Sequence, residues 1–315
     1  MNAHRRSPAR DITVPADHAG RRLDKFLRAR LKGVPAGLIF RLLRKGAVRV
    51  DDRRARPDHR LETGEIISVP ALDLPPPATA PVPANLRKAV AAAVVHESPD
   101  LLVLDKPADV AVHVGTGVRA GVIEALRALH PGEDLELAHR IDRDTSGLLM
   151  VARNQTMLRH LQDTLRAGEV ERGYLALVRG TVPGALRIDA PLLTTDSGVT
   201  VSPRGQDALT HVEPVRRLRR RATLIRAQLI TGRKHQIRAH THHMGHPIAG
   251  DPRYGDRNFS EEIARLGGRR MFLHAHSLRI PLPDGTPLEI TAPTPPEWDR
   301  TLDRLQTPGR RPPRR

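Results

Sequence analysis

LAHRIDRDTSGLLMVARN, Leu137–Asn154, places several charged side chains directly before an apolar segment. The charges belong to Arg140, Asp142, Arg143 and Asp144, and the run GLLMVA follows them almost at once. A short continuous apolar run of this kind is typical of a buried strand. The charges therefore form a surface turn, or one of them is an active-site group held on a rigid element.

The overall composition favours a polyanionic partner. The 315 residues include 52 Lys+Arg and 35 Asp+Glu, a net charge of +17, and such an excess attracts nucleic acid or an anionic membrane. A membrane partner is not expected, because the longest clean apolar run, Ala89–Val95, is far shorter than the roughly 20 residues of a spanning helix. No apolar segment follows the N-terminal arginines, which argues against a secretory signal. With zero cysteines, disulfides and thiol chemistry are excluded, and we expect a cytoplasmic protein.

Residues 21–70 form a small pattern of their own. Apolar stripes at helical spacing run from Leu23 to Leu31 and from Leu38 to Leu43. Strand-like pieces follow at Ala47–Val50 and Glu65–Pro70. The 40 residues from position 21 to position 60 hold 14 Lys+Arg and 4 Asp+Glu. This segment is therefore predicted to be a small basic domain.

The second helix of this segment carries Arg41, Arg44 and Lys45 away from its apolar stripe. An ordinary solvated helix face is one interpretation. The almost single-signed charge favours the other, a nucleic-acid-binding face, to which Lys25 of the first helix also belongs.

The remaining chain divides at LDLPPPATAPVP, whose proline content predicts a semi-rigid linker over residues 71–84. Residues 1–20 are predicted to be a flexible N-terminus, residues 85–305 a large domain, and residues 306–315 a basic disordered tail. Within the large domain, apolar strands are expected on both sides of Ser98–Asp100, followed by helices and further strands. The helices are expected at Val122–Leu129 and Thr156–Arg166, and the strands at Tyr174–Gly180, Ala222–Ile230 and Ser277–Leu282. Because strands and helices do not alternate regularly, the fold class is predicted to be α+β.

Two charged clusters could carry chemistry, HRIDRDTSG and the histidine-rich Leu229–Gly255. The G-x-S-x-G elbow and the P-loop pattern are both missing from the sequence. A metal site on the histidines was considered, but the pair His242 and His246 lacks the intervening glutamate of the H-E-x-x-H motif. We expect no metal, and packing or RNA contacts for these histidines.

Four motifs, in order, resemble those of the RluA family of pseudouridine synthases. HRIDRDTSGLLMVA resembles the family signature H-R-L-D-x-x-T-S-G-L, and DKPADVAVHVG resembles the preceding K-P-x-G-x-x-V-H segment. RGYLALVRG is similar to the tyrosine-bearing strand, and the histidine-rich segment is similar to the C-terminal signature. Residues 21–70 resemble an S4 RNA-binding domain. The resemblance implies a mixed, largely antiparallel catalytic sheet behind an S4 domain.

The resemblance also implies the chemistry, in which uridine is isomerised to pseudouridine without a cofactor. Asp142 matches the catalytic aspartate, and Arg233 matches the arginine that pairs with it, since a close guanidinium keeps a buried carboxylate ionised. Tyr174 matches the tyrosine that stacks on the target base. Arg140 is placed to enter the space that a flipped nucleotide leaves.

The same residues also have simpler interpretations. Asp142 could brace a turn through Thr145 and Ser146, Tyr174 could be plain core, and Arg233 could be a phosphate clamp. Four residues of the matching motifs are expected to make further RNA contacts: Lys106, His113, His235 and Arg238. A scaffold role is the alternative for Lys106 and His113.

We expect a monomeric enzyme that modifies 23S ribosomal RNA, either free or in an assembling large subunit. A tRNA-directed synthase and a non-catalytic S4-domain ribosome-assembly protein are the alternatives. A binding protein would have no reason to keep Asp142, Tyr174 and Arg233 together.

Overall fold

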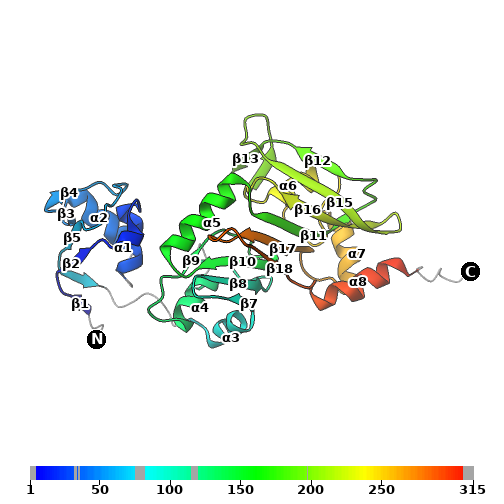
Figure 1. The fold of residues 1–315 in the computed structure, drawn as a ribbon. Helices are drawn as coiled ribbons and strands as arrows, with labels where there is room; N and C mark the ends of the chain where they lie inside the picture. The colour runs from blue at the N-terminus through cyan, green and yellow to red at the C-terminus, as the bar shows by residue number, and fades with distance from the viewer. Residues whose placement is uncertain are drawn as a thin grey trace, which may run out of the picture.

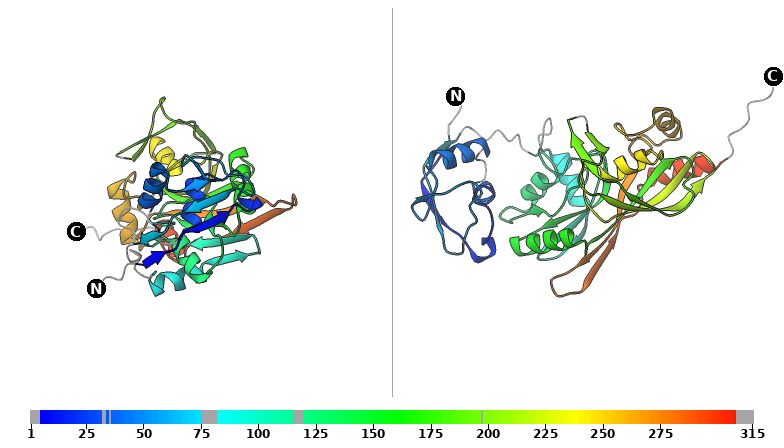
Figure 2. Two further views of the ribbon diagram at one scale, coloured as in Figure 1. Left: turned by 90° about the vertical axis from the view of Figure 1, so that its left-hand side faces the viewer. Right: turned by 90° about the horizontal axis from the view of Figure 1, so that it is seen from above.

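The structure is a computed structural model that describes residues 5–31, 34, 36–74, 82–114, 120–196 and 198–307. They form an N-terminal domain, residues 5–74, and a large domain, residues 82–307, which lie beside each other (Figures 1 and 2). Residues 75–81 of the predicted linker and residues 308–315 of the predicted tail lie outside the described residues. No helix in the described part of the chain is long and apolar enough to cross a membrane.

The N-terminal domain packs two helices on a four-stranded sheet. The helices α1 (Leu23–Arg30) and α2 (Ala36–Lys45) match the two predicted stripes. The sheet has the order β2 (Arg10–Thr13), β5 (Ile66–Val69), β3 (Arg49–Val50) and β4 (Arg53–Arg54). Its core holds apolar side chains of the two stripes, among them Phe26, Leu27, Ile39 and Leu43, together with Ile67 of β5.

The prediction of a flexible segment over residues 1–20 is wrong for the part that the structure describes. Strand β2 pairs with β5, β1 (Arg5–Ser7) pairs with β6 (Leu72–Leu74), and the 3-10 helix η1 spans Ala16–His18. Strand pairing joins main-chain groups and does not require an apolar run. Short polar strands therefore escape a search based on hydrophobic patterns.

The large domain is built on one ten-stranded sheet, and the predicted α+β class is confirmed. The pairing of β10 with β17 is parallel, while the other pairings in this sheet are antiparallel among the described residues. The main path runs β12 (Leu186–Asp189), β15 (Leu209–Leu218), β16 (Ala222–Leu229), β11 (Glu171–Arg179), β17 (Leu273–Pro281), β10 (Ser146–Ala152), β8 (Leu101–Lys106) and β7 (Val94–Glu97). Off this path, β18 (Pro287–Thr291) pairs with β17 and β9 (Glu136–Leu137) pairs with β10. A separate hairpin joins β13 (Leu192–Thr195) to β14 (Gly198–Val201).

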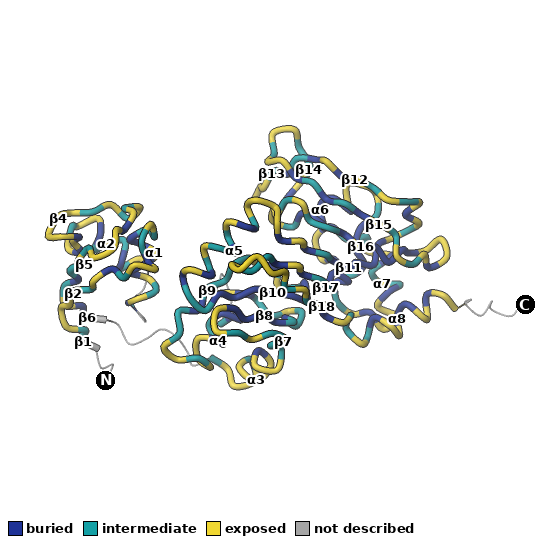
Figure 3. Tube along the Cα trace, in the orientation of Figure 1, coloured by how far each residue is buried: buried dark blue, intermediate teal, exposed yellow. Residues whose placement is uncertain are grey.

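Helices cover this sheet, and the central strands are the most buried part of the molecule (Figure 3). The helices are α3 (Ala84–Ala92), α4 (Val122–Leu129), α5 (Gln155–Ala167), α6 (Gln236–His243), α7 (Arg257–Arg265) and α8 (Pro296–Gln306). Trp298 of α8 is fully buried and stacks on Phe272 at 4.8 Å between ring centroids. The apolar run Ala89–Val95 is divided between two elements, because its first alanines belong to α3 and β7 begins only at Val94.

Strand β10 is the predicted buried strand GLLMVA, and every one of its residues is buried. Its neighbours on either side are β8 and β17. Gly147 has φ of +107°, and a Cβ there would lie 2.2 Å from the carbonyl oxygen of Ala275 on β17. The glycine thus permits the close approach of two backbones at the place where the charged loop, residues 138–145, enters the sheet.

Candidate active site

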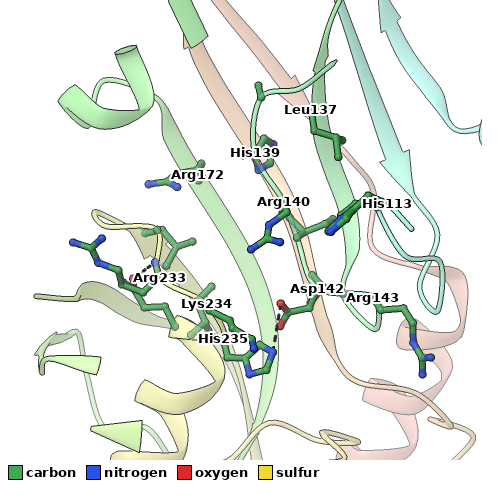
Figure 4. Close-up of a pocket in the computed structure, with 18 of the residues that line it drawn as sticks. His113, Leu137, His139, Arg140, Asp142, Arg143, Arg172, Arg233, Lys234 and His235 are labelled. Carbon is green, nitrogen blue, oxygen red and sulfur yellow. Dashed lines mark hydrogen bonds and ion pairs between the residues drawn. The ribbon is translucent and has the colours of Figure 1, made fainter. Parts of the chain in front are cut away.

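A pocket of about 1070 Å³ opens where this loop, strand β11 and the start of α6 meet (Figure 4). Among the described residues that line it, Asp142 is the only carboxylate. The same lining includes eight lysines and arginines: Lys25, Arg28, Arg140, Arg143, Arg172, Arg233, Lys234 and Arg238. The pocket therefore suits an anionic ligand and holds a single candidate acid.

Asp142 is held by a guanidinium and lies near an imidazole. Oδ2 of Asp142 accepts a hydrogen bond of 2.8 Å from Nη1 of Arg238. Its other oxygen, Oδ1, lies 3.8 Å from Nε2 of His235. The carboxylate is 26% exposed, so a ligand in the pocket can reach it.

A second carboxylate, that of Asp251, holds Arg238 through the guanidinium nitrogens that do not bind Asp142. Nε and Nη2 of Arg238 each donate a 2.8 Å hydrogen bond to Asp251, whose side chain is fully buried. Burial raises the pKa of Asp251, but hydrogen bonds from Arg238 and from the main-chain N–H groups of Tyr254 and Arg253 outweigh it and leave the pKa lowered. Burial by itself lowers the pKa of Arg238, and the two carboxylates reverse this and leave it raised. The guanidinium fork thus has one fixed direction toward Asp142.

His235 stands in an unusual backbone conformation immediately before α6. Its φ of +54° is in the left-handed region, which costs free energy for a residue with a Cβ. Nδ1 of His235 is 2.8 Å from the hydroxyl of Tyr254, which accepts a hydrogen bond from the N–H of Val199. A neutral His235 ring that accepts the phenol proton at Nδ1 carries its own proton on Nε2, the nitrogen that lies near Asp142. Burial lowers the pKa of His235, and the charge of Asp142 opposes this only in part.

Tyr174 belongs both to the core and to the pocket. It lies on β11, is 7% exposed, and packs in the main apolar cluster of the large domain. It also lines the pocket. Burial raises the pKa of its phenol to about 12, so the ring is neutral near pH 7. The two interpretations of this tyrosine are compatible.

The predicted pairing of Arg233 with Asp142 is wrong, because Arg238 occupies that place. Nε of Arg233 donates to the carbonyl oxygen of Asp207 at 3.0 Å, and the side chain lies exposed on the pocket wall. Helix α6 begins at Gln236, so Arg238 is turned inward while Arg233 stays on the preceding turn. The exposed position of Arg233 agrees with the phosphate-clamp interpretation.

Lys106 serves the scaffold, and the prediction of a direct RNA contact is wrong for this residue. Its side chain is fully buried. Nζ donates hydrogen bonds of 2.8 to 3.0 Å to the carbonyl oxygens of Pro107, Val110 and Arg143. Lys106 thus ties the segment after β8 to the loop that carries Asp142.

His139 also supports the loop. Its Nε2 accepts a 3.1 Å hydrogen bond from the N–H of Met150 on β10. Burial first, and then the charge of Arg172, lowers the pKa of His139 to about 3. The neutral ring can therefore act as an acceptor near pH 7. The alternative that Asp142 braces the turn with its carboxylate is not observed among the described residues, since Ser146 Oγ bonds to Nδ1 of His274 instead.

The predicted RNA contacts whose side chains are exposed fall into two groups. Arg140 and His113 are exposed on the pocket wall, and Lys25 of α1 reaches the same pocket from the N-terminal domain. The cluster on α2 is exposed but does not line this pocket: Arg41, Arg44 and Lys45.

The histidines of the C-terminal motif mostly bond to main-chain oxygens. His240, His242 and His246 donate to the carbonyl oxygens of Ala190, Tyr254 and Arg179, respectively. No group of three or more potential ligands that could hold a metal ion is found in the described part of the chain. These contacts give the imidazoles packing roles.

Sequence reasoning missed Asp251 and Arg172. Asp251 lies in the run GHPIAGDPRYG at the end of the histidine-rich segment, and its position after an apolar segment was the available signal. Arg172 stands two residues before Tyr174, so strand alternation places both side chains on one face. That spacing could have identified Arg172 as a second pocket residue.

Comparisons with known proteins agree with this geometry. A family model described as RNA pseudouridylate synthase matches residues 100–243, and an S4 domain model matches residues 21–67. Both agree with the resemblance drawn from the motifs.

Curated relatives match nearly the whole chain. A protein of Pasteurella multocida named ribosomal large subunit pseudouridine synthase C is 45% identical over 94% of this chain and 93% of its own length. The protein of that name from Escherichia coli K12 is 43% identical over 94% of this chain and 96% of its own length. Among solved structures, human RNA pseudouridylate synthase domain containing 4 is 26% identical with a TM-score of 0.58, covering 70% of this chain and 96% of that one. The chain belongs to the RNA pseudouridylate synthase family and carries an S4 domain ahead of its catalytic domain.

Proposed function

We propose that this enzyme isomerises uridines of large-subunit 23S ribosomal RNA to pseudouridine, with Asp142 as the catalytic carboxylate. The family supports the reaction, and the name shared by the curated relatives supports the substrate. The observation that carries the assignment of Asp142 is its place as the only carboxylate among the described residues that line a basic pocket. The isomerisation breaks the N1–C1′ bond, forms a C5–C1′ bond, and moves one proton from C5 to N1.

The pocket provides for the steps that this reaction needs. A uridine inside folded RNA must leave its stack to reach a carboxylate inside the pocket, at a cost of a few kcal/mol. Arg140 lies exposed on the pocket wall and is placed to fill the space that the base vacates. Tyr174 offers a neutral aromatic ring for the base, and Arg238 holds Asp142 in one orientation.

The N-terminal domain is proposed to bind RNA next to the target. Nη2 of Arg21 forms a 3.0 Å ion pair with Glu136 of the large domain. Arg159 of α5 donates to the carbonyl oxygens of Ala19 and Asp17 at 3.1 and 2.9 Å. These contacts bring Lys25 of α1 to the active-site pocket. RNA that enters the pocket would then touch both domains.

We further propose that the enzyme acts as a monomer in the cytoplasm, on free or assembling large-subunit RNA. One chain supplies Asp142, Arg238, Tyr174 and the basic wall, which supports a site that is complete without a second copy. The alternatives are a tRNA substrate and a purely RNA-binding role, and assays of pseudouridine formation and RNA affinity distinguish them.

The substitution Asp142→Asn is expected to abolish pseudouridine formation on 23S transcripts and to leave RNA affinity nearly unchanged. The amide keeps the shape of the side chain but cannot act as a carboxylate, whereas phosphate contacts dominate the affinity. Tritium release from 5-³H-uridine RNA measures the reaction, and filter binding measures the affinity. Full activity of the variant would refute the assignment of Asp142. Wild-type enzyme that acts on tRNA but not on 23S RNA would refute the ribosomal substrate. Wild-type enzyme that binds RNA but forms no pseudouridine in any RNA would refute a catalytic role.

A further inference from the structure

Arg172 is a buried arginine of the active-site pocket that has no counter-ion among the residues that the structure describes. It lies on β11, is 8% exposed, and lines the pocket. Its Nε is buried without a hydrogen-bond partner, and its guanidinium makes no hydrogen bond or ion pair with the described residues. Figure 4 shows it on the same side of the pocket as Arg233, with Arg140 and Asp142 across from them.

None of the described groups beside Arg172 offers it an unpaired negative charge. The ring of His139 is neutral near pH 7, as is the phenol of Tyr174. The carboxylate of Asp142 is already bound by Arg238. The guanidinium is seated against the turn before α6, because a Cβ added at Gly232 would lie 2.7 Å from Nη1 of Arg172. The glycine at this position leaves room for the guanidinium.

A buried guanidinium without a partner costs the ligand-free protein folding free energy. A buried cation without a partner loses its hydration and gains no ion pair in return. Burial accordingly lowers the pKa of Arg172, although an arginine remains protonated in proteins. Arg153 is a contrasting case in the same domain, because its guanidinium binds Glu133 and Glu97. The missing anion at Arg172 points to a ligand that supplies it.

We propose that Arg172 binds a phosphodiester group of the RNA backbone adjacent to the target uridine. This inference rests on the proposed function, because a uridine that enters the pocket carries its own flanking phosphates with it. A planar guanidinium matches two phosphate oxygens with parallel hydrogen bonds. Arg172 is therefore a binding residue that positions the nucleotide over Asp142 and takes no part in the bond changes.

The test compares Arg172→Met with Arg153→Met in the full-length enzyme. Removing the unpaired cation is expected to leave the Tm unchanged or raise it, whereas Arg153→Met is expected to lower the Tm because it leaves two carboxylates without their partner. Arg172→Met is expected to raise KM and to reduce the slope of log Kd against log salt by about 0.7 to 0.9, the loss of one phosphate contact. Arg153→Met should leave that slope unchanged.

Substrates with one neutral methylphosphonate linkage, on the 5′ or the 3′ side of the mapped target uridine, locate the contact. One of these two modified substrates is expected to bind wild-type enzyme more weakly than unmodified RNA does. The same substrate should bind Arg172→Met as tightly as unmodified RNA binds this variant. A Tm that falls in Arg172→Met as it does in Arg153→Met, with the salt slope unchanged, would show a structural role and overturn the proposal. Equal penalties from both linkages in wild type and variant would also overturn it. Wild-type enzyme that binds RNA with these signatures but forms no pseudouridine would instead overturn the proposed function.

Discussion

Arg238 and Arg233 stand five positions apart in one motif, and only the structure distinguishes their roles. Both are arginines in a basic segment, so composition and spacing give them equal claims on Asp142. The start of α6 at Gln236 decides between them, because it turns Arg238 toward Asp142 and Asp251 and leaves Arg233 on the pocket wall. The sequence thus sufficed to propose Asp142 as the catalytic carboxylate, while its partner depended on where a helix begins.

The first residue-scale prediction concerns that partner. Arg238→Lys keeps the positive charge but loses the fork that binds Asp251 and Asp142 together, so kcat is expected to fall by about 100-fold through misplacement of the carboxylate. Arg233→Lys is the matched control, and its kcat is expected to stay within about threefold of wild type because a lysine still contacts phosphate. Single-turnover assays at saturating RNA measure both. A larger loss in Arg233→Lys would return the pairing role to Arg233.

The second residue-scale prediction concerns pH. The pKa of His139 is lowered to about 3 and that of His274 to about 4, in both cases mainly by burial. Between pH 4 and 6.5 the unfolded chain binds protons at these positions that the folded chain does not, so the free energy of unfolding rises with pH across this window. Each histidine contributes at most about 1.4 kcal/mol per pH unit.

Urea unfolding at several pH values measures this slope. In His139→Gln the amide oxygen can still accept the hydrogen bond from Met150 but does not titrate. The slope of the unfolding free energy against pH should therefore decrease by the equivalent of up to one bound proton. An identical slope in the variant would show that His139 is protonated in the folded enzyme.

At the scale of elements, the sequence predicted those whose side chains repeat in a clear pattern. The helix predicted at Val122–Leu129 has the bounds of α4, and GLLMVA lies within β10. Strand β2 was missed because its residues, RDIT, carry no apolar stripe and their pairing with β5 is made by the main chain. Short polar strands and helix starts depend on distant partners, and those partners are set by the tertiary fold.

The element-scale prediction concerns the junction of β10 and β17. Gly147→Ala is expected to cost several kcal/mol of unfolding free energy, because the new Cβ would lie 2.2 Å from a carbonyl oxygen in addition to the strained φ. Gly132→Ala is the control, since Gly132 has a similar φ of +98° with no atom within 4 Å, and it should cost only about 1 kcal/mol. Chemical denaturation of both variants measures the difference. Equal costs would mean that the two strands can separate without penalty.

At the scale of the whole molecule, the two domains share one pocket. Lys25 and Arg28 of α1 line it together with residues of the large domain. The double variant Lys25→Ala/Arg28→Ala is therefore expected to weaken RNA binding and to reduce its salt slope by about 1.4 to 1.8, the loss of two phosphate contacts. The control Arg257→Ala/Arg265→Ala removes two exposed arginines of α7, which do not line the pocket, and should leave the slope unchanged. Equal effects of the two double variants would indicate that general charge, and not the position of α1, sets the affinity.

If Asp142 is the catalytic carboxylate, the pseudouridines that this enzyme makes in large-subunit ribosomal RNA depend on it. The most direct measurement maps pseudouridines in total RNA from cells without the gene, complemented with the wild-type gene or with Asp142→Asn. The predicted result is that specific 23S pseudouridines disappear without the gene, return with the wild-type copy, and stay absent with the variant. Pseudouridines that are unchanged by loss of the gene, or that return with Asp142→Asn, would contradict the account.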